Sequence, residues 1–272
     1  MGLITDRLIR SAAFSRQFLE GDARDKIAGF ILSRQNRDGG FQGRGAESDL
    51  YYTMFAVAGL KALGHPIPAF KVWKYAQSFG VGQDLDLVHL TCLIRLRIAF
   101  PMFKKARKKL FKMLAQHGAD SAYDLFVKLL AEDYLREADF PETLLQVPLT
   151  GPTTNIAAAL IINRRYDKEA EGTLMSRFTE AGGFTPTTGV AEPDLLSTAT
   201  AVFALVNQGT NLDAIQKPCI KYAESLWRDS GGFAGHAADG FEDVEYTFYA
   251  LLTMGCLIQS LASDYGNSTR TQ

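Results

Sequence analysis

The sequence predicts an all-α protein in which about six helix-pair repeats close into an α/α (α6–α6) barrel, or toroid. Three observations support this prediction. A Gly-Gly-Phe motif followed by a loop, an acidic residue and an apolar stretch occurs in residues 35–60, 180–205 and 229–254. Polar anchors precede apolar stretches about 40 residues apart, which is the period of paired-helix repeats. Amphipathic and wholly apolar stretches alternate, whereas the period-two alternation of strands is sparse.

The polar anchors mark the helices that we expect on the inside of the ring. They are Asp49, Asp86, Asp124, Asn155, Asp194 and Asp243. The stretches that follow them, such as 201–206 and 248–258, are apolar on nearly every side, which is typical of buried helices. We expect the aspartates to cap these helices, because a carboxylate accepts hydrogen bonds from the free N–H groups of a first turn.

Amphipathic stretches upstream of the anchors predict the outer helices. The clearest are 23–35, 69–79, 103–116 and 218–229, where apolar residues at helical spacing alternate with Lys, Arg and Glu. We expect one such helix before every anchor. Gly39, Gly182 and Gly231 follow outer helices and are expected to supply the positive φ that ends a helix. The phenylalanine after each glycine pair is expected to pack back on the helix pair.

The composition limits the organisation and the partners. No linker or low-complexity segment divides residues 1–272, which predicts a single domain. A net charge of −1 argues against a nucleic-acid partner. The three cysteines are widely spaced and odd in number, as expected for reduced thiols in the cytoplasm. The basic face from Lys104 to Lys109 is expected to face solvent, and an acidic protein partner or membrane association through it stays open.

Carboxylates in excess of the caps are expected to gather at one mouth of the barrel, because every inner helix begins at the same end. They are Glu47, Asp84, Glu192, Glu242 and Glu245. Such a ring of acids can hold a divalent metal, donate a proton or face water, and the pattern alone leaves these three roles open.

Aromatic residues of the inner helices are candidates for the wall of a central cavity. The candidates are Tyr51, Tyr52, Phe55, His89, Phe203, Tyr246, Phe248 and Tyr249. Aromatic walls suit a polyene chain and stabilise carbocations through their faces, although plain core filling explains them equally well. Asp86, His89 and Cys92 are zinc-competent ligand types, but their spacing carries them round the helix rather than to one point.

Residues 35–44 (QNRDGGFQGR) and 49–60 (DLYYTMFAVAGL) resemble the repeat shared by protein prenyltransferase β subunits and squalene-type cyclases. The resemblance recurs at 182–205 and 231–251 and covers most of the chain weakly. It implies an α6–α6 barrel whose apolar cavity takes isoprenoid chains. It also implies that Arg44 helps to hold a diphosphate.

The resemblance does not extend to the zinc site of the prenyltransferase β subunits, which use an Asp-x-Cys motif and a later His. Asp194 matches the aspartate, while Leu196 stands for the cysteine and Tyr246 for the histidine. Leucine has no ligating atom, so the sequence does not favour zinc at Asp194. The cofactor stays unassigned, with magnesium left open.

The segment from Asp243 to Thr247 (DVEYT) resembles the Asp-x-Asp-Asp motif with which the cyclases protonate their substrate. This resemblance implies that Asp243 and Glu245 act as acids. Burial of Glu245 would raise its pKa and suit it to proton donation.

The leading functional prediction is a barrel that binds or transforms a prenyl diphosphate or polyprene, with Tyr246 and Tyr249 among its walls. One alternative is cyclase-like acid catalysis at Asp243 and Glu245, and another is a non-catalytic binding module, so the sequence leaves open whether the chain is an enzyme. A saccharide-binding barrel would carry tryptophans at its mouth, but Trp73 and Trp227 fall on predicted outer helices.

Overall fold

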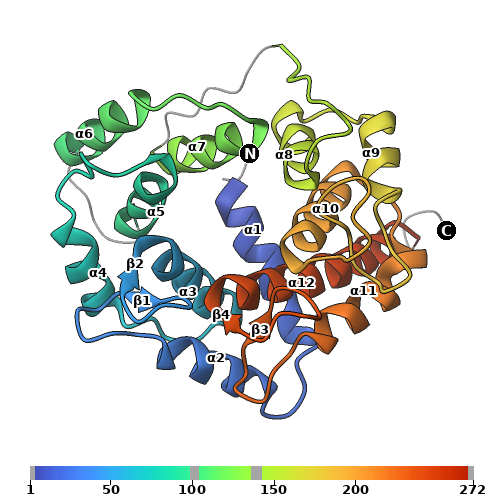
Figure 1. Cartoon of the computed structure of the whole chain (residues 1–272), viewed down its shortest axis with the longest axis horizontal. Helices are drawn as coiled ribbons and strands as arrows, with labels where there is room; N and C mark the ends of the chain where they lie inside the picture. Colours follow the sequence, from blue (N-terminus) through green and yellow to red (C-terminus); the bar gives the residue numbers. More distant parts are fainter. Residues whose placement is uncertain (1–3, 99–103, 136–142, 269–272) are drawn as a thin grey trace.

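The computed structural model, which describes residues 4–98, 104–135 and 143–268, confirms the all-α toroid. Its inner helices are α3 (Leu50–Leu63), α5 (Leu87–Ile98), α7 (Ala122–Leu135), α8 (Thr153–Asn163), α10 (Leu195–Gln208) and α12 (Val244–Ser268). Each packs on the next, and α12 packs on α3, so the ring is closed (Figure 1).

The outer helices lie around this ring (Figure 1). They are α2 (Ala23–Ser33), α4 (Ala69–Ser78), α6 (Lys104–Ala115), α9 (Lys168–Met175) and α11 (Asp213–Ser225). The prediction of an outer helix before every inner helix was wrong in one place, because residues 143–152, the described part of the connection from α7 to α8, form no helix. Residues 136–142 lie outside the described part of the chain.

The N-terminal helices α1 (Ile4–Ala13) and η1 (Phe14–Gln17) belong to none of the predicted pairs. Helix α1 packs on α12, α3 and α7, and Figure 1 shows it across the middle of the ring. It approaches α12 so closely that a Cβ on Gly255 would lie 2.0 Å from the carbonyl oxygen of Ser11. Helix α1 therefore covers one end of the ring.

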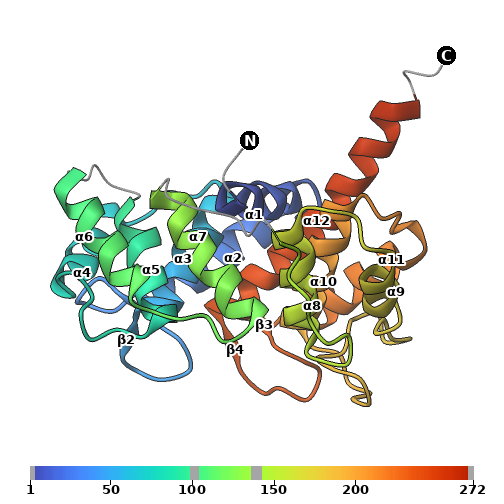
Figure 2. The ribbon, with the colours of Figure 1, turned by 90° about the horizontal axis from the view of Figure 1, so that it is seen from above.

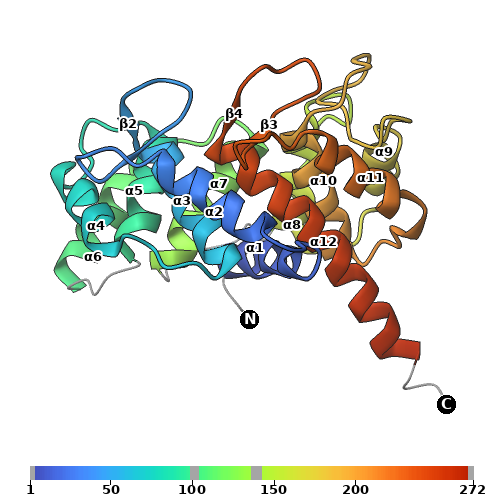
Figure 3. The ribbon, with the colours of Figure 1, turned by 90° about the horizontal axis from the view of Figure 1, so that it is seen from below.

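Two short antiparallel hairpins lie at the other end (Figures 2 and 3). They pair β1 (Phe41–Gln42) with β2 (Ser48–Asp49) and β3 (Phe233–Ala234) with β4 (Glu242–Asp243). In each hairpin the phenylalanine of the Gly-Gly-Phe motif lies opposite the capping aspartate. The hairpins therefore set the starts of α3 and α12 at the same rim.

A hydrogen-bonded junction holds each of these helix starts. The Asp49 side chain accepts from the backbone N–H of Tyr51 at 2.6 Å, as predicted for a cap. The Thr53 hydroxyl donates to the Asp49 carbonyl at 2.6 Å and accepts from the Phe41 N–H at 2.8 Å. The same arrangement recurs at α10 and α12, in Phe184, Asp194 and Thr198 and in Phe233, Asp243 and Thr247.

Two of the six predicted anchors lie inside a first turn rather than at a cap. Asp124 follows the start of α7, where the Ser121 hydroxyl accepts from the Asp124 N–H. Asn155 lies within α8, and its side-chain oxygen accepts from the Tyr123 N–H at 2.9 Å. This bond joins the starts of α7 and α8, so both helices still begin at one rim.

The paired glycines do not end the outer helices, contrary to the prediction. Gly39, Gly182 and Gly231 lie several residues beyond the helix ends, at φ of 98°, 93° and 94°. A Cβ on any of them would lie 2.2–2.4 Å from a backbone carbonyl oxygen of the next outer helix. At Gly231 that oxygen belongs to Lys26 of α2, so the last repeat touches the first and completes the outer layer.

None of the described helices combines the length and apolar composition that crossing a bilayer requires. The thiols of Cys92, Cys219 and Cys256 are free and buried. The core is dominated by one continuous cluster that includes residues of all six inner helices.

Replacing Gly231 by alanine is expected to destabilise the protein by about 2 kcal/mol more than replacing Gly189 by alanine. Both glycines have positive φ, at 94° and 84°, so both substitutions carry backbone strain. Only at Gly231 would the new methyl group collide with α2, because nothing lies within 4 Å of a Cβ on Gly189. Urea unfolding of the two variants measures the difference, and equal losses would contradict a tight contact between the last and first repeats.

Candidate functional site

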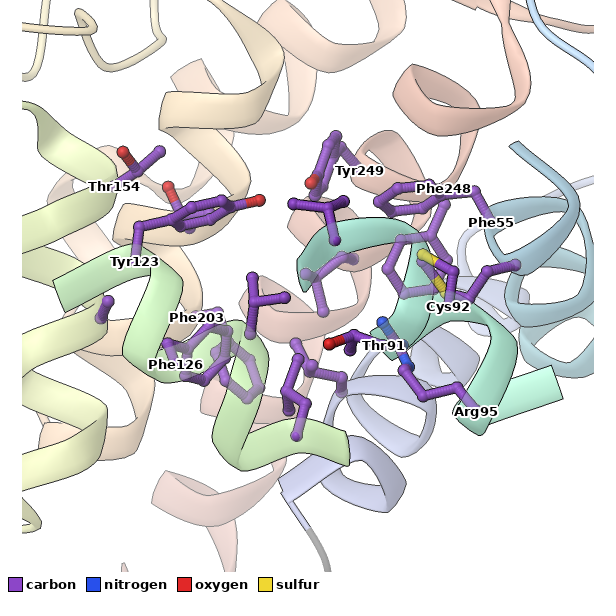
Figure 4. A pocket seen from close by; sticks show the side chains of 18 of the residues that line it. Phe55, Thr91, Cys92, Arg95, Tyr123, Phe126, Thr154, Phe203, Phe248 and Tyr249 are labelled. Carbon is purple, nitrogen blue, oxygen red and sulfur yellow. The ribbon is translucent and has the colours of Figure 1, made fainter. Parts of the chain in front are cut away.

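The inner helices surround a central cavity with a volume of about 80 Å³ (Figure 4). All six contribute to its wall, and Leu8 of α1 contributes from the covered end. The wall is mostly apolar, with aromatic rings, three threonines of α5, α8 and α10, and one arginine. At roughly 10–15 Å³ per water position, the cavity has room for about half a dozen waters. This volume suits the end of a small apolar chain.

Aromatic rings from α3 and α12 form the densest part of the wall. The ring of Phe55 lies 4.8 Å from Tyr51, 5.7 Å from Phe248 and 5.3 Å from Tyr249, measured between centroids. These rings meet edge to face or tilted, so ring faces remain exposed to the cavity. Together with Phe203 of α10, they are the predicted wall residues that the structure places in the cavity.

Tyr52 and Tyr246 were predicted for the wall, but the structure places them at the rim over the loops. A Cβ on Gly43 would lie 2.2 Å from the Tyr52 ring, and one on Gly235 would lie 2.6 Å from the Tyr246 ring. The two tyrosines occupy equivalent positions in their repeats. The glycines beneath them allow each loop to lie flat against a ring.

His89 also lies at the rim rather than in the cavity wall. Its Nε2 is 3.1 Å from Asp49 Oδ2, and its Nδ1 is 2.9 Å from Asp86 Oδ2. Burial acts to lower the pKa of His89, but the carboxylates of Asp86 and Asp49 outweigh it and raise the pKa. The histidine therefore bridges the caps of α3 and α5 as a cation at mildly acidic pH.

Arg44, which the family resemblance assigns to a diphosphate, is held by two carboxylates. Its Nη2 lies 2.5 Å from Asp239 Oδ2, and its Nε lies 3.0 Å from Asp243 Oδ2. Its guanidinium carbon also lies 5.5 Å from the centroid of the Tyr246 ring. An incoming anion would have to compete with both carboxylates for Arg44. Asp243 is fully buried and accepts from both Arg44 and the Tyr246 N–H, which are the contacts of a capping carboxylate.

Glu245 has a strongly raised pKa. Burial raises the pKa of Glu245 from 4.5 to about 7, against the lowering effect of a hydrogen bond from Tyr51 and with a contribution from the charge of Asp243. The Tyr51 hydroxyl donates to Glu245 Oε1 at 2.5 Å. Because Tyr51 also lines the cavity, the pair connects the rim to the aromatic wall. Near neutral pH this carboxyl group can hold or release a proton.

The donor set at Asp194 does not fit zinc. Its two side-chain oxygens accept from the N–H and the hydroxyl of Ser197, and the neighbouring Leu196 offers no ligand. Among residues 4–98, 104–135 and 143–268, no three His, Cys, Asp or Glu side chains lie where they could share a metal ion. Asp194 therefore acts as a helix cap in this structure.

The sequence analysis did not single out several residues that define the site. Asp239 precedes β4 and holds Arg44, and Tyr123 of α7 lines the cavity beside Tyr249 (Figure 4). Thr91 and Arg95 bring polar groups to the same cavity from α5. The position of Arg95 among apolar residues of α5 could have predicted a polar group in the cavity wall. The exposed lysines of the segment from Lys104 to Lys109 lie on α6, and a partner for them stays a prediction.

Comparison with known proteins identifies the fold family. The model of the prenyltransferase alpha-alpha toroid domain matches residues 9–108 and 154–269. Among the matching solved structures is the crystal structure of a protein from Actinoplanes, which is 14% identical. The match covers 89% of this chain and 99% of that chain with a TM-score of 0.53, a likeness of fold alone. No curated protein matches the chain.

Replacing Glu245 by glutamine is expected to change how stability depends on pH. The folded pKa of Glu245 is about 7 and the unfolded value is 4.5, so the wild type loses stability as the pH rises through this interval. The loss amounts to about 3 kcal/mol at about 1.4 kcal/mol per pKa unit. The variant keeps a neutral acceptor for Tyr51 and avoids this loss.

Urea unfolding at about pH 4 and at about pH 8 measures this effect, since the two values bracket the titration. The unfolding free energy of the variant minus that of wild type should be larger at about pH 8 than at about pH 4. Glu47→Gln is the matched control, because Glu47 is an exposed rim carboxylate. A parallel pH profile in wild type and Glu245→Gln would show that Glu245 titrates normally.

Proposed function

The chain belongs to the family of prenyltransferase alpha-alpha toroid domains, and we propose that it binds an isoprenoid chain, as a prenyl diphosphate or polyprene, in its central cavity. The observation that carries this proposal is a cavity walled by all six inner helices and rich in aromatic rings. Apolar walls with few polar groups are typical of sites that take apolar ligands. A branched polyene also gains from the ring faces of Tyr51, Phe55 and Tyr249.

The dimensions fit a chain that enters from the rim. Helix α1 covers the opposite end, so the ligand would enter from the rim that carries the hairpins. The cavity volume of about 80 Å³ accommodates the end of the chain, and the remainder extends toward the mouth. The rim residues Tyr52 and Tyr246 would then meet the part of the ligand that emerges.

Filling the cavity is expected to prevent binding. Ala157→Leu adds a branched side chain to the wall, whereas Ala159→Leu makes the same change on α8 outside the wall. Both variants carry a packing cost of about 1–3 kcal/mol, so only the cavity distinguishes them. We expect the affinity for geraniol and farnesol to fall at least about tenfold in the first variant and to stay near wild type in the second.

Native mass spectrometry and ligand-dependent thermal shifts measure both affinities. Equal affinity in wild type and Ala157→Leu would place the ligand elsewhere. The absence of binding to wild type would contradict the proposal itself.

A second candidate function is acid catalysis at Glu245, which the raised pKa and the bond from Tyr51 favour. A neutral Glu245 would transfer its proton to one carbon of a carbon–carbon double bond. The other carbon would become a tertiary carbocation, which faces of the surrounding rings stabilise. The carboxylate left behind would keep the hydrogen bond from Tyr51. Loss of a neighbouring proton or addition of water would then complete the reaction.

This mechanism makes the rate depend on Glu245. We expect Glu245→Gln to lower turnover of a prenyl substrate by at least about 100-fold, the usual contribution of a positioned acid. Wild-type turnover should fall as the pH rises above about 7, because the acid ionises there. Tyr51→Phe should retain part of the rate, and Glu47→Gln should retain all of it.

Product analysis by mass spectrometry in D₂O is the measurement, because protonation by the enzyme places solvent deuterium on carbon in the product. Turnover without deuterium, or unchanged in Glu245→Gln, would exclude this acid. Binding without any turnover would leave the chain a binding module.

A further inference from the structure

The cavity wall includes a cation with one unsatisfied buried donor. Arg95 of α5 lines it, and its Nε atom is buried without a hydrogen bond. None of the ion pairs within residues 4–98, 104–135 and 143–268 involves Arg95. Figure 4 shows the side chain directed into the space between the helices. An arginine with an unsatisfied donor in an apolar cavity wall is suited to bind an anion.

A second unused polar group lies beside it. Thr91 is one helical turn earlier on the same face of α5, is 1% exposed and lines the cavity. Its hydroxyl has no hydrogen-bond partner. Figure 4 shows the Thr91 and Arg95 side chains near one another on α5. The two side chains together offer N–H and O–H donors to the same part of the cavity.

A second positive charge acts on the same region. Lys61 of α3 is half-buried, which lowers its pKa, and the charge of Arg95 lowers it further. The carboxylate of Asp6 from α1 acts in the opposite direction on Lys61. Lys61 and Arg95 both belong to the last turns of their helices, so both cations lie at the end of the cavity that α1 covers.

Stabilisation of the helix C-termini does not account for these cations. A cation in a last turn gains only weakly from the helix dipole. Arg95 is partly buried, and its Nε donor is buried without an acceptor. A buried donor without an acceptor is unfavourable, and an anion bound beside Arg95 would supply one.

The rim offers no comparable site for an anion. Arg44 is already paired with Asp239 and Asp243, and Glu245 adds a further acid beside them. An anionic group at the mouth would meet these carboxylates. At the covered end it would meet Arg95, Thr91 and Lys61 instead.

We propose that the covered end of the cavity binds the anionic head group, a phosphate or a carboxylate, of an amphipathic isoprenoid whose chain extends toward the mouth. This proposal rests on the proposed function and adds the direction in which the ligand lies. Arg95 supplies paired N–H donors to the oxyanion, Thr91 supplies a hydroxyl donor, and Lys61 supplies charge. The aromatic rings then contact the hydrocarbon chain, and the far end of the ligand lies near Tyr51 and Glu245.

The test compares three probes that share one hydrocarbon chain: farnesol, farnesyl monophosphate and farnesoic acid. Wild type is expected to bind at least one anionic probe about tenfold or more tightly than farnesol. Arg95→Met should abolish this preference and keep the affinity for farnesol, while Arg95→Lys should keep part of the preference. Arg37→Met, which removes one exposed positive charge from a loop, is the matched control and should keep all of it.

Three results would overturn the proposal: wild type binds farnesol equally well, the preference survives in Arg95→Met, or Arg44→Met removes the preference instead. Failure of all three probes to bind would contradict the proposed function as well. Melting temperature provides a second measurement. Because a buried donor without an acceptor is unfavourable, ligand-free Arg95→Met should melt no lower than wild type, and a lower melting temperature would show that Arg95 has a structural role.

Discussion

The junction at the start of the inner helices is the constraint on which the rest of the structure depends. In three repeats an aspartate caps the helix, and a threonine one turn later ties the cap to a buried phenylalanine. This junction fixes where the helix begins relative to its hairpin or loop. Because equivalent junctions stand side by side around the ring, the caps gather at one rim. The sides of the helices are then left to form the cavity, and the last turns of α3 and α5 lie toward the end covered by α1.

The same arrangement separates the charges of the site. At the rim, the aspartates needed for capping are joined by Glu245, and Arg44 and His89 pair with the acids there. At the covered end, Arg95 and Lys61 lie in last turns, and no described ion pair includes either of them, although Asp6 of α1 acts on Lys61. The cavity between them has apolar walls, which screen charge poorly. A ligand with one charged end therefore experiences opposite surroundings at the two ends of the cavity.

The repeat pattern was enough to predict the fold, since the phenylalanines and capping aspartates act within one repeat. The role of the paired glycines was not predicted correctly, because each contacts a helix of another repeat. Gly231 needs its positive φ to meet Lys26, more than 200 positions away, and no local pattern reveals this. Of the wall residues, Phe55 and Tyr249 follow from helical periodicity, whereas His89 is drawn to the rim by the cap of a neighbouring helix. Arg95 was overlooked because arginines in the last turn of an apolar helix, here Arg95 and Arg97, resemble surface residues near a helix C-terminus.

The pairing of Glu245 with Tyr51 shows how the rim differs from a zinc site built on the same positions. Leucine and tyrosine replace two ligands at Leu196 and Tyr246, and both side-chain oxygens of Asp194 accept from Ser197. Leu196 and Tyr246 therefore offer no cysteine or histidine ligand. Each of the other rim acids, Asp243 and Glu245, is then either charged or protonated. Asp243 can bear charge because Arg44 lies 3.0 Å from it, whereas Glu245 has only a neutral phenol as a hydrogen-bond partner. A buried carboxyl group beside a carboxylate and without a cation of its own holds its proton. The rim therefore holds one carboxyl group that can keep its proton near neutral pH.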